Sequence, residues 1–317
     1  LKNTVNLDVT LYRSNTYHQT IYGKTSTSSL YSEQIVQSGN VQNQGIELSL
    51  GYRNTFGKIG VSSVLTYTLN QNKIKELSKA SVNQQGIPEI QKAYLGASSV
   101  APQVILREGG TMSDIYIKHE LKRDPNGSIA IDPSSGNLSM QEVGQRKAGH
   151  LAPNYNMGWN NSISYQGLTL GFVLSARVGG LAYSATQGIL DYYGGSKATA
   201  DARDNGGVPV NFGKVDAKKY YQTIATAEGG YGSYYLYSAT NVRLQELSLS
   251  YDLPKKWFNN KLNLSIGLLA RNLWMIYCKA PFDPELSAST SSNYYQGVDY
   301  FMLPSTRNIG FNVKVQF

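Results

Sequence analysis

The sequence is poor in charge, in cysteine and in long apolar runs, and each shortage excludes a class of protein. Charged residues make up 16% of the 317 residues, against about 25% in soluble globular domains. The longest apolar run, with glycine counted, has six residues, whereas a transmembrane helix needs about 20. A helical membrane protein is therefore excluded, although a membrane β-barrel, whose strands alternate, is not. The single cysteine, Cys278, rules out an internal disulfide.

The start of the chain and its net charge narrow the choice further. Residue 1 is leucine and no apolar signal segment follows it, so we expect a mature piece or a fragment. The net charge is +8, but no zinc-finger or RNP-like spacing accompanies it, and we expect no nucleic-acid partner. An anionic membrane surface suits the charge better.

The strongest positive signal is a period of two in the apolar residues. Val5, Leu7, Val9 and Leu11, for example, alternate with polar residues. Alternation of this kind places the apolar side chains on one face of a strand and the polar ones on the other. It predicts eight strands, at residues 4–12, 45–53, 58–70, 154–165, 168–179, 241–253, 261–276 and 307–317. In the sixth the phase changes at Gln245-Glu246, where we expect a β-bulge.

The connections between these strands alternate strictly between short and long. Those at 54–57, 166–167 and 254–260 are short, and those at 13–40, 71–153, 180–240 and 277–306 are long. Outer-membrane barrels have short periplasmic turns and long extracellular loops, whereas compact soluble domains rarely hold several loops of this size. We therefore expect an all-β fold, a transmembrane antiparallel β-barrel. A soluble sandwich is the alternative, and whether segment 72–153 adds two further barrel strands stays open.

Segments spread along most of the chain resemble one known family in the same order. They are SGNVQNQGIELSL (38–50), REGGTMSDIYI (107–117), GHLAPNYNMGWNNSISYQGLTLGFVLSARVGG (149–180), SATNVRLQELSLSYDLP (238–254), ARNLWMIY and FDPE (270–277 and 282–285), and GFNVKVQF (310–317). The second departs from the family pattern in its last part. Together they resemble the C-terminal part of the SusC/RagA family of TonB-dependent outer-membrane transporters.

The resemblance implies a fold and a function for the whole chain, residues 1–317. These eight strands are expected to be about the last eight of a 22-strand barrel, with the plug domain and the TonB box outside this sequence. The family imports oligomeric nutrients, glycans or peptides, across the outer membrane. Its partners are a SusD-like surface lipoprotein that acts as a lid and the TonB–ExbB–ExbD complex, which acts on the absent N-terminal part. Contact with outer-membrane lipid and lipopolysaccharide follows from the location.

Other functions remain open at this point. A passive porin and a siderophore-type TonB-dependent receptor share the barrel architecture, and a non-transport β-rich adhesin would share the strand pattern. We expect no enzymatic activity, because no nucleophile or phosphate-loop motif occurs and the three histidines lie far apart in the sequence. We also expect no cofactor.

Two groups of residues are candidates for function. Tyrosine, with 24 copies, offers a large apolar area and a hydroxyl at low entropic cost, which suits a recognition surface. Those of the long loops are candidates for binding substrate or the lid, with packing between loops as the alternative: Tyr192, Tyr193, Tyr231, Tyr234, Tyr235, Tyr294, Tyr295 and Tyr300. Five charged residues face the lumen by strand parity, because charge on the lipid face is costly: Glu47, Arg53, Arg177, Arg243 and Arg271.

One loop offers a weak metal candidate. Asp124, Asn126 and Asp132 could supply oxygen ligands to calcium, but the segment lacks the acidic spacing and the bidentate glutamate of an EF-hand. A turn driven by Pro125, Asn126 and Gly127 is the favoured interpretation.

Overall fold

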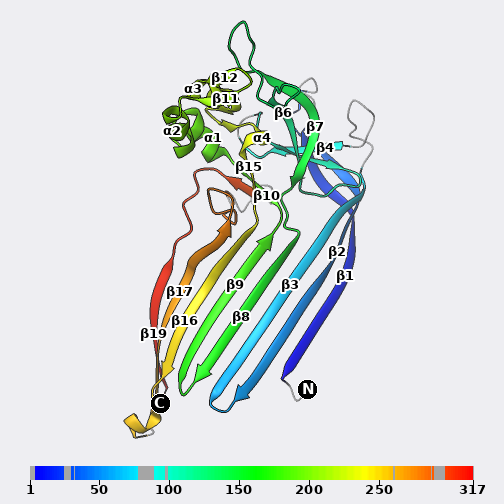
Figure 1. Cartoon of the computed structure of the whole chain (residues 1–317). Coiled ribbons are helices and arrows are strands. Elements are labelled where there is room, and N and C mark those ends of the chain that lie inside the picture. The colour runs from blue at the N-terminus through cyan, green and yellow to red at the C-terminus, as the bar shows by residue number, and fades with distance from the viewer. Residues whose placement is uncertain are drawn as a thin grey trace.

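The computed structural model describes residues 4–24, 30–31, 33–77, 89–96, 99–259, 261–286, 288 and 297–316. This part of the chain divides into a large sheet of long strands and a loop region gathered at one end of it (Figure 1). We call the elements between β3 and β8, those between β9 and β16, and β18 the loop region. None of the described helices has the length and apolar content needed to cross a membrane.

The large sheet is antiparallel and holds all eight predicted strands as neighbours in chain order. They are β1 (Val5–Lys24), β2 (Glu33–Phe56), β3 (Ile59–Glu76), β8 (Tyr155–Tyr165), β9 (Leu168–Val178), β16 (Asn241–Asp252), β17 (Asn263–Cys278) and β19 (Asn308–Gln316). Within the described residues β1 pairs only with β2 and β19 only with β17, so the sheet is open. The eight strands therefore do not close into a small barrel of their own.

The register gives the sheet a common apolar face, which the opposed pair Ser63 and Asn161 interrupts on β3 and β8. Residues directly opposite each other on paired antiparallel strands share a face. One row crosses seven strands through Leu7, Leu50, Leu65, Trp159, Leu174, Leu244 and Trp274. A second row crosses six strands through Ile59, Tyr165, Leu168, Tyr251, Ile266 and Val313. Alternation within each strand thus becomes a contiguous apolar surface, much of it exposed, as at Phe311 (81%).

The short connections are at the end of the sheet opposite the loop region (Figure 1). Between β8 and β9 only Gln166 and Gly167 intervene, and both have positive φ, 49° and 89°. A type I′ hairpin turn requires this geometry at both central residues. The turn between β2 and β3 is shorter than expected, since β2 runs on to Phe56 and leaves only Gly57 and Lys58. The third, between β16 and β17, contains the 3₁₀ turn η2 (Lys255–Phe258).

The predicted β-bulge in β16 is confirmed. The pairing of β16 with both neighbours shifts register between Leu244 and Glu246. The extra residue restores a common face for the apolar residues on either side of it.

The expectation of a long loop over residues 13–40 is wrong. Strand β1 continues to Lys24 and β2 starts at Glu33, and the two stay paired up to Lys24 opposite Glu33. The sequence prediction ended where the apolar alternation ended. Backbone pairing continues because the hydrogen bonds between two antiparallel strands join main-chain groups and need no apolar alternation.

Segment 72–153 adds no strand to the large sheet among its described residues. It forms a separate four-stranded antiparallel sheet in chain order. The strands are β4 (Glu89–Tyr94), β5 (Gln103–Arg107), β6 (Asp114–Leu121) and β7 (Met140–His150). This sheet joins the upper end of β3 through hydrogen bonds between Ile74 and the backbone of Gly109 and Gly110.

The rest of the loop region consists of short helices and small sheets. The helices are α1 (Ala185–Tyr192), α2 (Lys197–Asp204), α3 (Ala217–Ile224) and α4 (Gly232–Tyr235). The strands are β10 (Leu181–Ser184), β11 (Val208–Val210), β12 (Gly213–Val215), β13 (Ala225–Thr226), β14 (Gly229–Gly230), β15 (Leu236–Ser238) and β18 (Val298–Asp299). Ser184, Ser196 and Asp216 cap α1, α2 and α3, their side chains accepting a backbone N–H of the first turn.

The buried core lies in the loop region. It includes Ile90, Leu106, Ile115, Tyr183, Tyr235 and Val298, and it reaches the large sheet at Val41 and Ile74 near the upper ends of β2 and β3. The three-stranded sheet β15-β10-β18 joins two connections of the chain, the one between β9 and β16 and the one between β17 and β19. The loop region is therefore a folded body with its own core, which fixes the positions of its side chains.

Candidate functional site

The face of the large sheet opposite the apolar one carries the predicted inward charges. Glu47 lies opposite Thr10 and Thr68, and Arg53 lies opposite Ser62. Neither forms an ion pair with a described residue. The register thus has both on the polar face, where strand parity placed them.

Arg271 pairs across the sheet with a residue of the bulge. Its Nε lies 3.1 Å from Oε2 of Glu246, the residue opposite it in register. Both side chains are well exposed, at 61% and 33%. An exposed pair of this kind contributes about 0–1 kcal/mol to stability. Arg271 thus pairs with Glu246, a charged residue outside the set that strand parity predicted.

Arg243 forms the most buried charge cluster on this face. Its Nη2 lies 2.8 Å from Oδ1 of Asp283 and 3.4 Å from Oε2 of Glu285, and Nη1 also donates to Asp283. Burial raises the pKa of Asp283, but the hydrogen bonds from Arg243 and from the Glu285 backbone outweigh it and hold that pKa below its ordinary value. The cluster fixes the start of the connection after β17 to the wall of the sheet.

Arg177 fixes a second connection to the sheet. Its Nη2 donates to the carbonyl oxygen of Leu151 at 2.8 Å, in the segment that precedes β8. Its Nε is buried without a hydrogen-bond partner in the described part of the chain. Arg177 and Arg243 therefore hold the bases of the long connections.

Two of the candidate tyrosines belong to the interior of the loop region. Tyr235 is 1% exposed, and its hydroxyl donates to Oδ2 of Asp191 at 3.0 Å. Burial among apolar side chains raises the pKa of Tyr235 above its ordinary value. The hydroxyl of Tyr234 accepts the backbone N–H of Leu121 at 2.8 Å. Tyr235 is not a surface residue, so the prediction that it recognises substrate or the lid is wrong. It packs in the core of the loop region.

Other candidate tyrosines reach the surface. Tyr193 is 71% exposed and lies edge-on to Tyr192, with ring centroids 5.1 Å apart. Tyr300 is 49% exposed and packs edge-on against Phe301 at 5.6 Å. The ring of Tyr231 lies edge-on to the ring of His119, with ring centroids 5.6 Å apart. A role in binding stays a prediction for these residues, and Tyr294 and Tyr295 lie outside the described residues.

Phe301 has an unusual backbone for a bulky residue. Its φ is 48°, in the left-handed region that aromatic residues rarely adopt. Its backbone N–H donates to the hydroxyl of Thr186 in α1 at 2.7 Å, which holds the turn in place. The aromatic pair of Tyr300 and Phe301 is therefore presented on a fixed turn beside α1.

The calcium candidate is a pair of self-capped turns. Oδ1 of Asp124 accepts the N–H groups of Asn126 and Ser128, and Oδ1 of Asp132 accepts from Ser134. Hydrogen bonds from Ser134 lower the pKa of Asp132. Among the described residues, no group of three or more histidine, cysteine or acidic side chains could hold a metal. The geometry is that of a turn, the interpretation that the sequence favoured.

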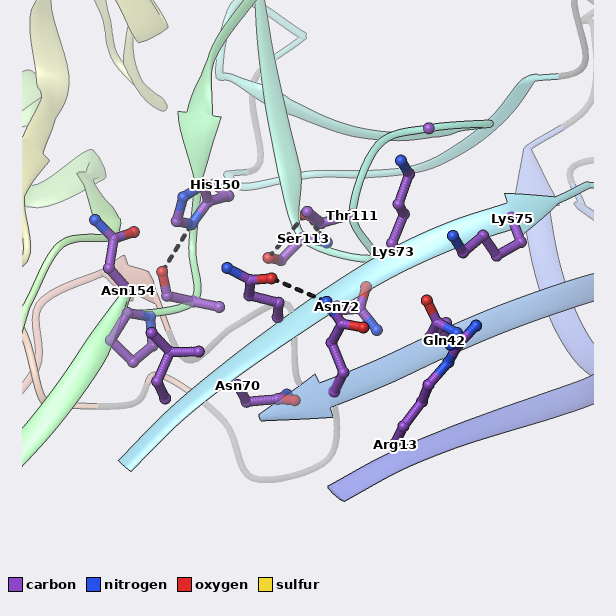
Figure 2. Close-up of a pocket in the computed structure, with 16 residues that line it drawn as sticks. Arg13, Gln42, Asn70, Asn72, Lys73, Lys75, Thr111, Ser113, His150 and Asn154 are labelled. Atoms are coloured by element: carbon purple, nitrogen blue, oxygen red, sulfur yellow. Dashed lines mark hydrogen bonds between the residues drawn. The ribbon is translucent and has the colours of Figure 1, made fainter. Parts of the chain in front are cut away.

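A polar cavity of about 690 Å³ lies where β3 runs beyond the end of β8 (Figure 2). The pairing of these strands stops at Thr68 and Asn156. Above that point the cavity is lined from β3, from the turn at 109–113 and from the segment at 150–154. Its polar and charged lining residues include Arg13, Gln42, Asn70, Asn72, Lys73, Lys75, Thr111, Ser113, His150 and Asn154. Sequence analysis missed this cavity, because its walls come from five separate segments with no shared motif.

Comparisons with known proteins agree with the architecture. No protein-family model matches the chain. The TonB-dependent receptor P3 of Formosa agariphila is 24% identical over 311 residues, which cover 90% of this chain and 30% of that protein. Structures of the RagAB peptide importer match 99% of this chain with TM-scores of 0.69 in the closed-closed state and 0.67 in the open-open state, at 19% and 18% identity. The chain spans about a third of the length of each.

The sequence segments, the eight-stranded sheet and these matches point the same way. The comparisons confirm that the chain resembles the barrel region of SusC/RagA-type TonB-dependent outer-membrane transporters.

Proposed function

We propose that the chain, residues 1–317, is the C-terminal wall and loop region of an outer-membrane importer for oligomeric nutrients. The observation that carries this proposal is the apolar face that extends across the sheet, interrupted at Ser63 and Asn161, with a polar, charged face behind it. In a closed barrel the apolar face meets lipid and the polar face lines the lumen. The loop region then shapes the mouth of the transporter.

The rest of the machinery lies outside this chain. A plug and the N-terminal segment that engages TonB–ExbB–ExbD would supply the energy, and a SusD-like lipoprotein would cover the mouth. A relative named a TonB-dependent receptor and the structural likeness to the RagAB peptide importer support these partners. The protein in this proposal is a transporter and not an enzyme.

The exposed aromatic residues of the loop region suit an oligomeric cargo. Tyr193, Tyr300 and Phe301 offer flat apolar surfaces beside hydroxyl groups, which can contact either sugar rings or peptide side chains. Oligopeptides and oligosaccharides therefore remain the two cargo classes, and the experiment separates them.

The test measures uptake in cells whose full-length gene is deleted and then restored. Labelled oligopeptides, labelled oligosaccharides and a ferric siderophore are supplied one at a time. We expect one of the oligomer classes to enter only in restored cells and only when TonB is present. Uptake that persists without TonB would indicate a passive porin, and uptake of the siderophore alone would indicate an iron receptor; either result would overturn the proposal.

A further inference from the structure

A polar belt lies directly above the apolar rows, on the same face of the sheet. The last apolar row on the first three strands is Leu11, Ile46 and Leu69. Two residues further along each strand, the next row on the same face is Arg13, Gln44 and Gln71. The row after that is Asn15, Gln42 and Lys73. The face that meets lipid in the proposed function therefore changes from apolar to polar and cationic within two residues.

The cavity of Figure 2 opens at this belt. Arg13, Gln42, Gln44, Gln71 and Lys73 all line it, together with Leu69 of the last apolar row. The polar belt is thus one wall of a half-open pocket of about 690 Å³ at the apolar boundary.

The charge of the cavity has one sign. Its lining includes the cations Arg13, Lys73 and Lys75 but no aspartate or glutamate. Arg13, Lys73 and Lys75 form no ion pair with the described residues. Like charges gathered without a counter-charge favour an anionic ligand.

One cation is held in place by a buried neighbour. Gln42 is 4% exposed, and its amide lies against the guanidinium of Arg13. With the amide turned so that its oxygen faces Arg13, that oxygen accepts from Nε and, at 2.8 Å, from Nη2. This contact orients Arg13, so the entropic cost of binding an anion there is reduced. Asn70, Asn72, Thr111 and Ser113 add amide and hydroxyl groups to the lining.

We propose that this cavity binds the phosphate of a lipid headgroup at the boundary of the membrane. The proposal rests on the membrane location in the proposed function. Guanidinium and ammonium groups form strong charge-assisted hydrogen bonds with phosphate oxygens. Leu69 and the apolar rows below it continue along the path of the acyl chains. A soluble anion would use the cations but would gain nothing from the apolar rows.

The test uses the full-length transporter purified in detergent and two lipid probes. One probe is bis-phosphorylated lipid A and the other is the same lipid after enzymatic dephosphorylation, and native mass spectrometry counts the lipid retained. Wild type should retain the phosphorylated form preferentially. Arg13→Gln and Lys73→Gln each remove one cation, and each should lower the preference for the phosphorylated probe by about fivefold. Arg13→Lys, which keeps the charge, should keep most of it.

The matched control removes two exposed lysines of the loop region that do not line the cavity. The double cavity variant combines Arg13→Gln with Lys73→Gln, and Lys122→Gln with Lys218→Gln changes the net charge by the same amount. It should retain lipid as wild type does. Heat-modifiable gel mobility checks that every variant is folded.

Three results would overturn the proposal. The first is equal retention of both lipid probes by the wild-type protein. The second is an unchanged preference for the phosphorylated probe in the double cavity variant. The third is release of the lipid by millimolar inorganic phosphate, which would assign the cavity to a soluble anion. Cargo uptake is measured separately, and the cavity variants should transport as wild type does. Failure of uptake in wild type would count against the transport function and leave the lipid result standing.

Discussion

Arg243 and Asp283, 40 residues apart, form a buried bidentate ion pair that joins β16 to the connection after β17. Nη2 to Oδ1 measures 2.8 Å, and the two side chains are 7% and 9% exposed. The backbone N–H of Glu285 also donates to Asp283, at 3.0 Å. The aspartate belongs to the FDPE segment that supported the family resemblance. The structure thus gives that segment a physical role, which is to anchor a long loop to the polar face of the sheet.

Replacing Arg243 by methionine should release this connection. The change leaves Asp283 as a buried carboxylate without its partner, and breaking a buried pair costs about 3–5 kcal/mol. Proteinase K cleavage of residues 279–307 in the full-length protein measures the opened population. Arg271→Met is the matched control, because its pair with Glu246 is exposed and contributes about 1 kcal/mol or less. Equal cleavage of the two variants would contradict the anchoring role.

The ion pair of Arg243 and Asp283 should make the stability of the loop region depend on pH in the acid range. The pKa of Asp283 is lowered in the folded protein, so its contribution is fully present above the ordinary aspartate value of about 3.9. It is lost as the pH falls through the lowered folded value. We therefore expect the melting temperature of the loop region to fall below about pH 4. Asp283→Asn should melt at a lower temperature at neutral pH and show a flatter profile; a profile parallel to wild type would assign the acid sensitivity to other carboxyl groups.

The strands could be predicted from the sequence because their alternation is set by the solvent on each face. Apolar residues at every second position identified all eight strands, and the change of phase near Gln245 located the bulge. The same criterion failed for residues 13–24 and 33–44. There, β1 and β2 remain paired after the apolar face ends, so no periodic signal marks the strand.

The site could be predicted only in part. Strand parity placed Arg177 and Arg243 on the polar face, but it could not show that Leu151 and Asp283 are their partners. Those contacts depend on how long connections fold back. Tyrosines in a loop look alike in the sequence, and only the three-dimensional packing separates buried Tyr235 from exposed Tyr193.

Substitution of Tyr235 should therefore affect folding of the loop region before it affects binding. Tyr235→Ala removes a fully buried ring and leaves a cavity, a change that costs about 3–5 kcal/mol. Tyr235→Phe keeps the ring but leaves Asp191 without its 3.0 Å donor, and should cost about 1–3 kcal/mol. Proteinase K cleavage of the loop region, measured across a denaturant series, gives both values. A Tyr235→Ala protein as stable as the Phe variant would show that the ring is not part of a tight core.

The exposed aromatic residues allow a test of cargo recognition without loss of folding. Tyr193→Ala with Tyr300→Ala removes two exposed rings, and exposed substitutions usually change stability by about 0.5 kcal/mol or less. If a few aromatic anchors dominate binding, uptake should fall by roughly tenfold, equivalent to about 1.4 kcal/mol. Uptake is compared at equal surface expression. Wild-type uptake by this variant would move recognition to the plug, the lid or other strands.

The final prediction concerns which end of the sheet faces the cell exterior. The tight turn at Lys58 and the turn containing Lys256 lie at one end, and Ser128 lies in the loop region at the other (Figure 1). Short turns on the periplasmic side and long loops outside are the rule for outer-membrane barrels. Cysteine is introduced at each of these three positions in the full-length protein, in a Cys278→Ser background that removes the native thiol.

A membrane-impermeant maleimide is then applied to intact cells and to lysed cells. Ser128→Cys should be labelled in both, because its side chain is exposed in the loop region. Lys58→Cys and Lys256→Cys, also exposed, should be labelled only after lysis, since the outer membrane separates them from the reagent. Lysed cells thus control for reactivity, so a difference between the two conditions reports sidedness alone. Labelling of both lysine positions on intact cells, with Ser128→Cys protected, would reverse the orientation and place the cationic cavity at the periplasmic leaflet.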